Sequence, residues 1–320
     1  MARQAWCEIL AKHYRHKSVK LLRSMRRYSL HFLYRHDGDR AGGDRYVLSQ
    51  VRRERSRVPF RLQFEIIDRL SRGDGTIMVR RMLPCAEPCT DPARRWVDDG
   101  THYWFVRSYT EHDPEPDWHD PRLVSASARQ LARIHEAAMG FPGRLGELRR
   151  DIAPYHWPVR RVLDDRAAFV DGMSGNRSEE DILAVKRNLA ELDEQAAAGL
   201  RLGPTGITHQ DYRPGNILVR DGEIVDVIDW DLARKDHFLY DAVLAAFHVG
   251  WCRTGNGRLD AAERFIDAYL NAIDIGIDKA AVGWMFRYVT TRNLVVSHSP
   301  EKWRELLRDV ERRGQGHWPY

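Results

Sequence analysis

The chain has 320 residues, of which 43% are hydrophobic and 30% are charged, and its formal net charge is +5. This composition excludes an intrinsically disordered chain and allows a large buried core. No apolar run approaches the roughly 18–20 residues that cross a bilayer, and the N-terminus has no apolar stretch of signal-peptide length. We therefore expect a cytoplasmic protein with no membrane partner.

The charge is distributed unevenly along the chain. Residues 1–110 carry 23 Lys and Arg against 12 Asp and Glu, whereas residues 111–320 carry 28 against 34. A basic half often indicates a nucleic-acid or phosphate partner. Because no recognition helix, RNA-binding signature or zinc finger accompanies it, we expect no nucleic-acid partner. A field that holds a polyphosphate fits the pattern better.

The first third of the chain is rich in β-branched and aromatic residues, which predicts a β-rich region. One segment within it, FRLQFEIIDRL, instead places its apolar residues at helical spacing. The expected strands are 18–23, 28–36, 45–51, 76–83 and 102–109, and the expected helix is 60–70.

A Pro- and Asp-rich stretch, EHDPEPDWHDP at 111–121, then predicts a boundary between two lobes, residues 1–110 and 111–320. Beyond it the apolar pattern becomes helical, and Ser178 with Asp181 has the spacing of a helix-capping box. The sequence therefore predicts an α+β protein with a helical second lobe. The expected helices are 123–139, 178–200, 241–250, 261–272 and 301–312.

Polar residues gather in the segment 207–231, ITHQDYRPGNILVRDGEIVDVIDWD. Two short apolar strands, 217–220 and 224–228, are joined by Asp-Gly, a strong signal for a two-residue hairpin turn. Antiparallel pairing of these strands would bring their outer ends together. One small region would then hold three carboxylates, an amide and an imidazole, from His209, Asp211, Asn216, Asp229 and Asp231.

Such a set of groups suits phosphoryl transfer. Asn and Asp supply the hard oxygen ligands that divalent cations need, and a carboxylate can orient a hydroxyl group and accept its proton. The string HQDYRPGN at 209–216 has the H-x-D-x-x-x-x-N spacing of kinase catalytic loops. A phosphoesterase built on the same carboxylates is less favoured, because the further His ligands of a two-metal site are missing.

The strings HQDYRPGNILV and VIDWD resemble the aminoglycoside phosphotransferase and choline-kinase-like family, whose segments read H-G-D-x-x-x-x-N and I-D-W. LARIHEA at 131–137 resembles the family's helix after the interlobe hinge, and LYDAVLAAF at 239–247 resembles its stretch with a bracing Asp. The resemblance covers most of the chain. It implies a two-lobed protein-kinase-like fold, with nucleotide bound by residues 1–110 and catalysis and acceptor binding in residues 111–320.

The resemblance also implies roles for individual residues. Asp211 would be the catalytic base or the carboxylate that orients the acceptor hydroxyl. Asn216 and Asp229 would be Mg²⁺ ligands, with ATP or GTP as the phosphoryl donor. Asp241 would brace the catalytic loop, a role compatible with capping its own helix, and His209 would support the loop rather than transfer a proton.

The nucleotide side departs from the family pattern. The family carries a Lys on its third strand, and Ser49 stands at that position here, with Glu65 as the expected partner carboxylate. A neutral residue removes a charge-assisted contact of roughly 1–3 kcal/mol. Either Arg52 or Arg53 could replace the missing cation, or the protein binds nucleotide weakly.

Two further regions are expected near the nucleotide. The loop before residue 28 contains no Gly, so Ser24, Arg26 and Arg27 could contact phosphate with side chains instead of a flexible backbone. Ser108 and Tyr109, at the end of the last strand before the boundary, are expected to line the nucleotide site.

Together these features predict a kinase that transfers the γ-phosphoryl group of ATP or GTP to a hydroxyl of an amino sugar, antibiotic or related natural product. The excess of acidic residues in 111–320 favours a cationic acceptor, although a neutral nucleoside or sugar stays open. A protein Ser/Thr kinase of the same fold is an alternative, but the short span from Asp229 to Asp241 has no A-P-E activation segment. A catalytically weak nucleotide-binding scaffold is a further alternative, suggested by Ser49.

Overall fold

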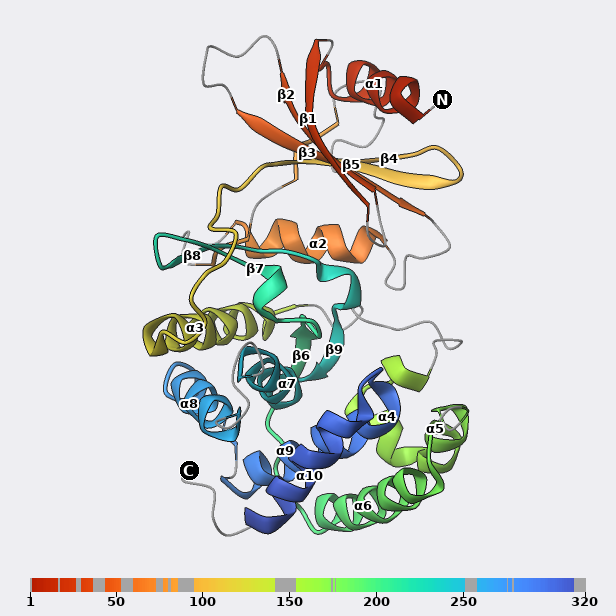
Figure 1. Ribbon diagram of the computed structural model, residues 1–320, viewed down its shortest axis with the longest axis vertical. Coiled ribbons are helices and arrows are strands. Elements are labelled where there is room, and N and C mark those ends of the chain that lie inside the picture. The colour runs from red at the N-terminus through yellow and green to blue at the C-terminus, as the bar shows by residue number, and fades with distance from the viewer. Residues whose placement is uncertain are drawn as a thin grey trace. The chain divides into compact units, whose positions relative to one another are not determined.

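The computed structural model describes residues 2–16, 18–26, 30–36, 44–52, 60–72, 77–79, 82–85, 95–141, 154–173, 175, 177–250, 258–274, 276–277 and 279–313. The chain forms two compact units (Figure 1). The sheet unit comprises Met1–Pro114, Leu218–Asp221 and Val225–Asp231. The helical unit comprises Glu115–Ile217, Gly222–Ile224 and Leu232–Tyr320. The α+β class predicted from the sequence is confirmed.

The sheet unit is built on an antiparallel sheet with the strand order β1-β2-β3-β5-β4. Its strands are β1 (Val19–Arg26), β2 (Leu30–His36), β3 (Arg45–Arg52), β4 (Trp96–Asp98) and β5 (His102–Ser108), and its helices are α1 (Ala2–His13) and α2 (Phe60–Leu70). The predicted β1, β2, β3, β5 and α2 are confirmed.

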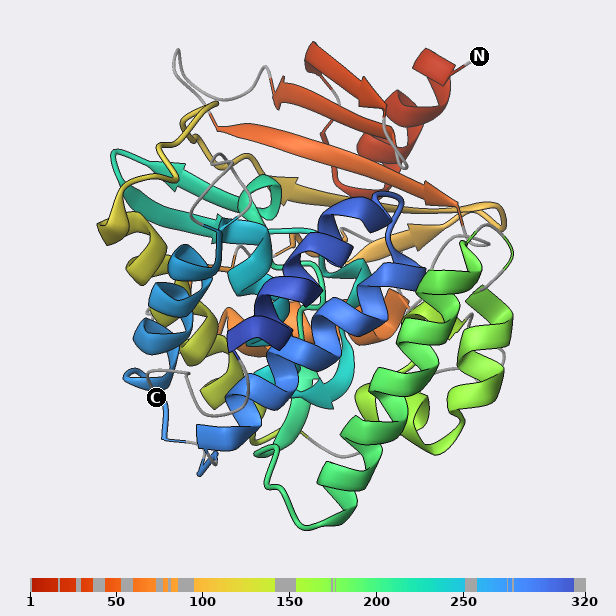
Figure 2. The same cartoon turned by 60° about the horizontal axis from the view of Figure 1, so that its bottom comes forward.

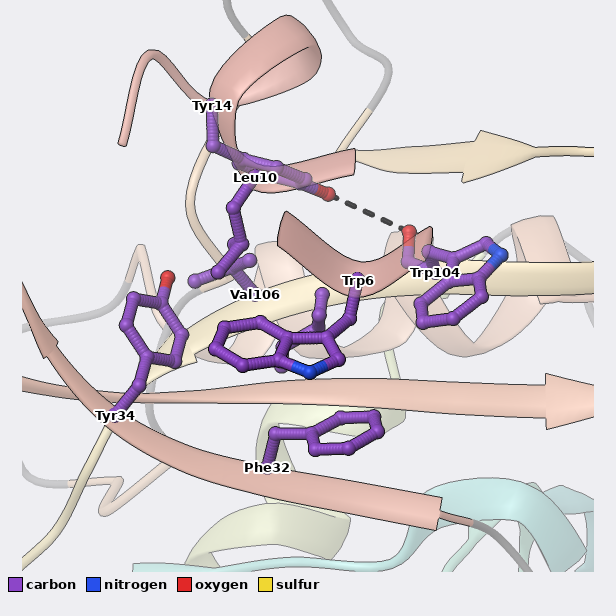
Figure 3. Close-up of a cluster of buried hydrophobic side chains, with 8 residues drawn as sticks. Trp6, Leu10, Tyr14, Phe32, Tyr34, Trp104 and Val106 are labelled. Carbon is purple, nitrogen blue, oxygen red and sulfur yellow. Dashed lines mark hydrogen bonds between the residues drawn. The ribbon is translucent and has the colours of Figure 1, made fainter. Parts of the chain in front are cut away.

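Helix α1 covers one face of this sheet and was not expected from the sequence (Figure 3). Trp6, Leu10 and Tyr14 recur every four residues, which places them on one helical stripe. All three are buried; the Trp6 ring stacks on Phe32 at 5.4 Å, and the Tyr14 hydroxyl donates to the carbonyl of Trp104 at 3.4 Å. This cluster determines which face of the sheet is covered by α1.

The opposite face of the sheet carries polar residues that matter for the site. Side chains alternate along a strand, so residues that neighbour the α1-facing ones point the other way. On β2 and β3 the register pairs His31 with Ser49, and on β3 and β5 it pairs Val47 with Arg107. These residues therefore share the face that α1 leaves uncovered.

The strand expected at 76–83 is wrong in its described part. Residues 77–79 and 82–83 form no strand, and only an isolated bridge joins Met82 to Arg107. The edge of β5 from Tyr103 to Phe105 is instead paired with β4, a three-residue strand that the sequence did not suggest. Because β4 pairs with β5 from Tyr103 to Phe105, residue 82 can pair with β5 only beyond Phe105, at Arg107.

The helical unit consists mainly of helices, and all of those expected from the sequence are confirmed. Ser178 caps α6 by accepting a hydrogen bond from the backbone N–H of Asp181 at 3.2 Å. Figure 2 shows α9 and α10 side by side, next to α6. The helices are α3 (Pro121–Ala138), α4 (Val159–Asp164), α5 (Arg166–Met173), α6 (Glu179–Ala197), α7 (Phe238–Gly250), α8 (Arg258–Leu270), α9 (Lys279–Val296) and α10 (Pro300–Arg313). None of the helices in the described part of the chain is both long enough and apolar enough to span a membrane.

A short two-stranded ladder in the helical unit leads into the polar segment. Strand β6 (Thr205–Thr208) pairs antiparallel with β9 (Arg234–His237). Gly206 is required here, because a Cβ at this position would lie 2.3 Å from the ring of Phe238. The ladder places the start of loop 208–216 beside the segment that leads into α7.

The hairpin predicted at the centre of the polar segment is confirmed. Strands β7 (Ile217–Arg220) and β8 (Glu223–Val227) form a two-stranded sheet. At the turn, Asp221 has φ 54° and Gly222 has φ 79°, the left-handed values that a type I′ turn requires at both central residues.

Candidate active site

Loop 208–216, which joins β6 to β7, holds Asp211 and Asn216 in direct contact. The Asn216 side-chain nitrogen donates to the Asp211 carbonyl at 2.9 Å and to carboxylate oxygen Oδ2 at 2.8 Å. Asn216 is buried, whereas Asp211 is half-buried. The loop therefore presents a carboxylate of fixed orientation at a partly open position.

Arg213, which the sequence reasoning did not single out, contacts the same carboxylate. Its Nε lies 3.0 Å from Asp211 Oδ1. Both side chains are partly exposed, so solvent screens this pair and its contribution to stability is small. Arg213 thus lies beside Oδ1 of the carboxylate, while Asn216 donates to Oδ2.

The backbone of the loop is fixed by Asp241, which lies in the first turn of α7. Asp241 Oδ2 accepts from the backbone N–H of His209 and Oδ1 accepts from that of Gln210, both at 2.8 Å. Gln210 has φ 67°, a left-handed conformation that is uncommon outside glycine. The two hydrogen bonds hold the backbone in this conformation, so the carboxylate of Asp241 determines the path of the loop.

His135 of α3 completes this buried arrangement. Its Nε2 lies 3.0 Å from Asp241 Oδ2 and its Nδ1 lies 2.8 Å from the Tyr269 hydroxyl. Burial opposes ionisation of Asp241, but the hydrogen bond and charge of His135, with those of His209, hold the pKa of Asp241 below its ordinary value. His135 therefore links α3 and Tyr269 to the carboxylate that holds the loop.

Two more contacts tie the loop to its surroundings. The Tyr212 hydroxyl donates to the carbonyl of Ser127 at 2.8 Å, and the backbone N–H of Asp211 donates to His209 Nδ1 at 3.2 Å. His209 is fully buried, so its side chain lies among the residues that hold the loop in place and is not accessible to solvent.

Asp229 lies just beyond the hairpin, in the sheet unit. It is exposed and has φ 68°, and the Trp230 indole beside it donates to the carbonyl of Val227 at 3.0 Å. Asp231 is also exposed. Because Asp211 and Asn216 belong to the helical unit, the approach of Asp229 to them stays a prediction.

Ser49, at the position of the missing Lys, is buried on β3 and bonded to His31. Its hydroxyl lies 2.8 Å from His31 Nδ1. Burial, followed by the charge of Arg107, lowers the pKa of His31 to about 4, although Asp229 acts in the opposite direction. The pair is therefore neutral at pH 7, and Arg107 is the described cation that acts on His31 electrostatically.

The other residues expected near the nucleotide are dispersed within the sheet unit. Arg52 is exposed at the end of β3, and Glu65 is half-buried on α2. Ser108 ends β5, and the ring of Tyr109 has the Arg45 guanidinium 4.6 Å from its centre. Arg53 and Arg27 lie outside the described residues, as does the Arg26 side chain, and Ser24 is exposed on β1.

The donor atoms fit a divalent cation bound with the help of phosphate oxygens. Among the described residues, no group of three or more His, Cys, Asp or Glu is placed to hold a metal ion. In Asn216 the amide nitrogen is used by Asp211, which leaves Oδ1, the atom that can ligate a hard cation. An amide oxygen of this kind suits an Mg²⁺ ion for which substrate phosphates supply further ligands.

His135, Arg213 and Tyr269 are the site residues that sequence reasoning missed. His135 sits in the apolar stripe of α3 within LARIHEA, where a polar residue is a signal for a buried partner. Arg213 lies inside the eight-residue template itself. Tyr269 follows from no local pattern, because α8 contributes it from another part of the chain.

A model of the phosphotransferase enzyme family (APH) matches residues 29–281. The chain belongs to this family. The matched span includes both halves of the polar segment, with Asp211, Asn216 and Asp229, and also Asp241 and Ser49. The predicted resemblance to aminoglycoside phosphotransferases is therefore confirmed at the level of the family.

Curated relatives of the chain are homoserine kinases. That of Phenylobacterium zucineum is 29% identical over 147 residues, which are 45% of this chain and 41% of the relative. That of Methylobacillus flagellatus is 26% identical over 198 residues, which are 61% of this chain and 56% of the relative. The chain thus spans about half the length of the curated relatives it matches.

Solved structures of small-molecule kinases share the fold along nearly the whole chain. Amicoumacin kinase in complex with AMP-PNP, Ca²⁺ and Ami has a TM-score of 0.61 at 14% identity, with 98% of this chain and 93% of that chain covered. A microcompartment-associated aminopropanol kinase has a TM-score of 0.61 at 17% identity, with 97% and 94% covered. At these identities the likeness establishes the fold alone, and it confirms the kinase-like fold predicted from the sequence.

Proposed function

We propose that the protein transfers the γ-phosphoryl group of ATP or GTP to a hydroxyl group of a small, amine-bearing molecule. The observation that carries this proposal is the arrangement of loop 208–216. Asp211 is oriented by Asn216, faces Arg213 and is fixed through the backbone contacts of Asp241. A fixed and partly open carboxylate is what the acceptor hydroxyl needs.

In the proposed reaction the acceptor hydroxyl donates a hydrogen bond to Asp211. As the hydroxyl oxygen attacks the γ-phosphorus, its proton passes to the carboxylate and the bond to the β-phosphate oxygen breaks. Asn216 and Arg213 keep the carboxylate from rotating away during this step. The geometry contributes by positioning, and no covalent intermediate with the protein is required.

The groups proposed to hold Mg²⁺ are Oδ1 of Asn216 and the carboxylate of Asp229. When bound, Mg²⁺ would supply positive charge to the β- and γ-phosphate oxygens. Support comes from the hairpin between these two residues. A two-residue turn joins β7 to β8, and opposed positions in such a hairpin are neighbours. Asn216 directly precedes β7 and Asp229 follows β8 by two residues.

Arg107 is our first candidate for the cation that replaces the strand Lys, ahead of Arg52 and Arg53. It lies on the same sheet face as Ser49, and its side chain is 24% exposed. Its Nη1 is 3.9 Å from Asp226 Oδ2, an ion pair too long for a hydrogen bond. The guanidinium is therefore positioned by Asp226 while its N–H groups stay available for phosphate.

The acceptor is proposed to be a small alcohol that carries an amino group. The excess of acidic residues in 111–320 favours a cation. Homoserine and aminopropanol, the compounds in the names of two similar proteins, are both small amino alcohols. Amino sugars and amine-bearing antibiotics belong to the same broad class and stay within the proposal.

A screen for acceptor-stimulated release of ADP or GDP tests this function. The acceptors are small amino alcohols, amino sugars, nucleosides and polyols, each assayed with ATP and with GTP. We expect stimulation by at least one amine-bearing alcohol, abolished in Asp211→Asn. Stimulation by none of the compounds, together with tight nucleotide binding, would favour the second candidate, a nucleotide-binding scaffold suggested by the neutral Ser49–His31 pair.

A further inference from the structure

The interior of the helical unit contains two buried arginines outside the loop described above. Arg234 lies on β9 and is 3% exposed, and Arg292 lies on α9 and is 2% exposed. Removing a guanidinium from water costs several kcal/mol unless a counter-charge compensates it. The question is therefore which groups neutralise these two cations.

Arg234 has a carboxylate beside it. Its Nε lies 3.6 Å from Asp236 Oδ2. The other oxygen of Asp236 accepts from the backbone N–H groups of Val159 at 3.1 Å and His237 at 2.9 Å. Arg234 and Asp236 thus form one neutral pair, although the two facing atoms are too far apart for a direct hydrogen bond.

Arg292 has only neutral partners in the described part of the chain. It donates through Nη1 to the Tyr240 hydroxyl and through Nη2 to the carbonyl of Tyr155 at 2.7 Å. The guanidinium also lies 5.1 Å from the centre of the Tyr240 ring. No ion pair of the described residues involves Arg292. Among the residues that the structure describes, Arg292 therefore has no carboxylate paired with it.

The nearby phenols do not supply the missing negative charge. Burial is the main cause that raises the pKa of Tyr240 and of Tyr288, so both remain neutral at physiological pH. Burial opposes the charged form of Arg292, but electrostatic interactions with its surroundings, among them the carboxylate of Asp236, outweigh burial and leave its pKa above the ordinary value. Arg292 is therefore charged.

Three buried hydrogen-bond donors of the helical unit also lack partners. Nε of Arg292, Nε of Arg234 and the hydroxyl of Tyr288 are buried without any hydrogen bond, as is the facing oxygen of Asp236. The Tyr288 ring meets Tyr240 edge to face at 5.9 Å, next to Arg292. A buried water molecule could satisfy such donors, but it would not supply Arg292 with a negative charge.

We infer that Arg292 and the Tyr288 hydroxyl bind one small, singly charged anion inside the helical unit. The ligand has halide or carboxylate chemistry: either a free inorganic ion such as chloride, or the carboxylate of a small acceptor molecule. Only the second source rests on the proposed function. Tyr240 directly precedes Asp241, so the anion would stabilise the start of the helix that holds loop 208–216.

Thermal unfolding of the full chain tests the site without any assay of activity. Sodium bromide is compared with sodium gluconate at equal ionic strength, because gluconate is a much bulkier anion than bromide. For the wild type we expect bromide to raise Tm by about 2–4 °C and to saturate, as one bound ligand does. Equal Tm values in the two salts would overturn the proposal.

Matched variants locate the effect. Arg292→Met is expected to abolish the bromide-dependent shift, and Tyr288→Phe, which removes one hydroxyl, to reduce it by half or more. Arg287→Met is the control on the same helix, because Arg287 already pairs with Glu191, and it should keep the full shift. A full shift in Tyr288→Phe and Arg292→Met would overturn the assignment.

Wild-type crystals soaked in bromide keep the test decisive if the variants do not fold. An anomalous peak beside Arg292 Nε supports the proposal, and bromide peaks confined to other places overturn it.

Two amino alcohols distinguish the sources of the anion. In gluconate buffer, homoserine carries a carboxylate and aminopropanol does not. A Tm increase with homoserine alone, lost when bromide competes and lost in Arg292→Met, assigns the site to the acceptor's carboxylate. A bromide effect without a homoserine effect assigns it to a free ion. No effect of bromide or homoserine overturns the proposal, whatever the outcome of the nucleotide-release screen.

Discussion

Loop 208–216 and the sheet face around Ser49 differ in how closely they follow the kinase pattern. The loop keeps Asp211 and Asn216, and Asp241 holds its backbone through two hydrogen bonds. On the sheet face, a neutral Ser49–His31 pair stands where the kinase pattern has a cation. Proton transfer tolerates little displacement of the reacting groups, whereas a diffuse phosphate charge can be neutralised from several directions. The comparison suggests that the first region is constrained more tightly than the second.

The largest expected effect is in the loop. Asp211→Asn removes the proton acceptor while keeping the size of the side chain, so turnover should fall by about 10²–10⁴-fold. Nucleotide affinity, measured by calorimetry, should change little. Asp221→Asn is the matched control, because Asn suits the same left-handed turn position and the residue is exposed. Wild-type turnover in Asp211→Asn would show that the loop's carboxylate has another role.

The next effect concerns the support of the loop. In Asp241→Asn an amide replaces the carboxylate that accepts from two backbone N–H groups and from His135, and we expect a loss of about 1.5–3 kcal/mol in the free energy of unfolding. Urea unfolding measures this loss. Asp164→Asn, which removes an exposed carboxylate paired with Arg160, should cost less than about 1 kcal/mol. Equal stability of the two variants would contradict the bracing role.

The sheet face can be tested through its cations. Arg107→Met should weaken nucleotide binding by about 10–100-fold, because a charge-assisted contact contributes about 1.5–3 kcal/mol. Arg52→Met and Arg53→Met are the matched comparisons, with binding measured by calorimetry. Weaker binding in either of these, together with unchanged binding in Arg107→Met, would place the cation at the end of β3 instead.

The smallest expected effect is a dependence of stability on pH. An unfolded His31 takes up its proton near pH 6.5 and the folded form only near pH 4, so between these values the unfolded chain binds more protons. Stability should therefore fall as pH decreases from about 6.5 to 4, with roughly 1–3 kcal/mol of the loss due to His31. Urea unfolding of His31→Asn across this range should show a correspondingly shallower loss. The same slope in variant and wild type would contradict the burial of a neutral imidazole.

Elements with a local signal were predictable, and elements that depend on distant partners were not. The β7–β8 hairpin follows from its Asp-Gly turn, and α6 begins where Ser178 caps it. The edge strand β4 has only three residues, and the pairing of β6 with β9 joins segments far apart in the chain. Helix α1 is an exception, because the four-residue spacing of Trp6, Leu10 and Tyr14 is a local signal and the helix was nevertheless not expected.

The sequence by itself determined the family, the α+β class and the loop in which Asp211 and Asn216 lie, because their spacing and turn chemistry are local properties of the chain. Only the tertiary structure decided which side chains hold that loop, that Ser49 pairs with His31 and that Arg234 and Arg292 are buried together. The contacts around Asp241 join α3, α7 and α8. The Ser49–His31 contact joins two neighbouring strands, and the two buried arginines come from β9 and α9. Burial and partnership depend on how separate elements pack, and no spacing within one segment encodes that packing.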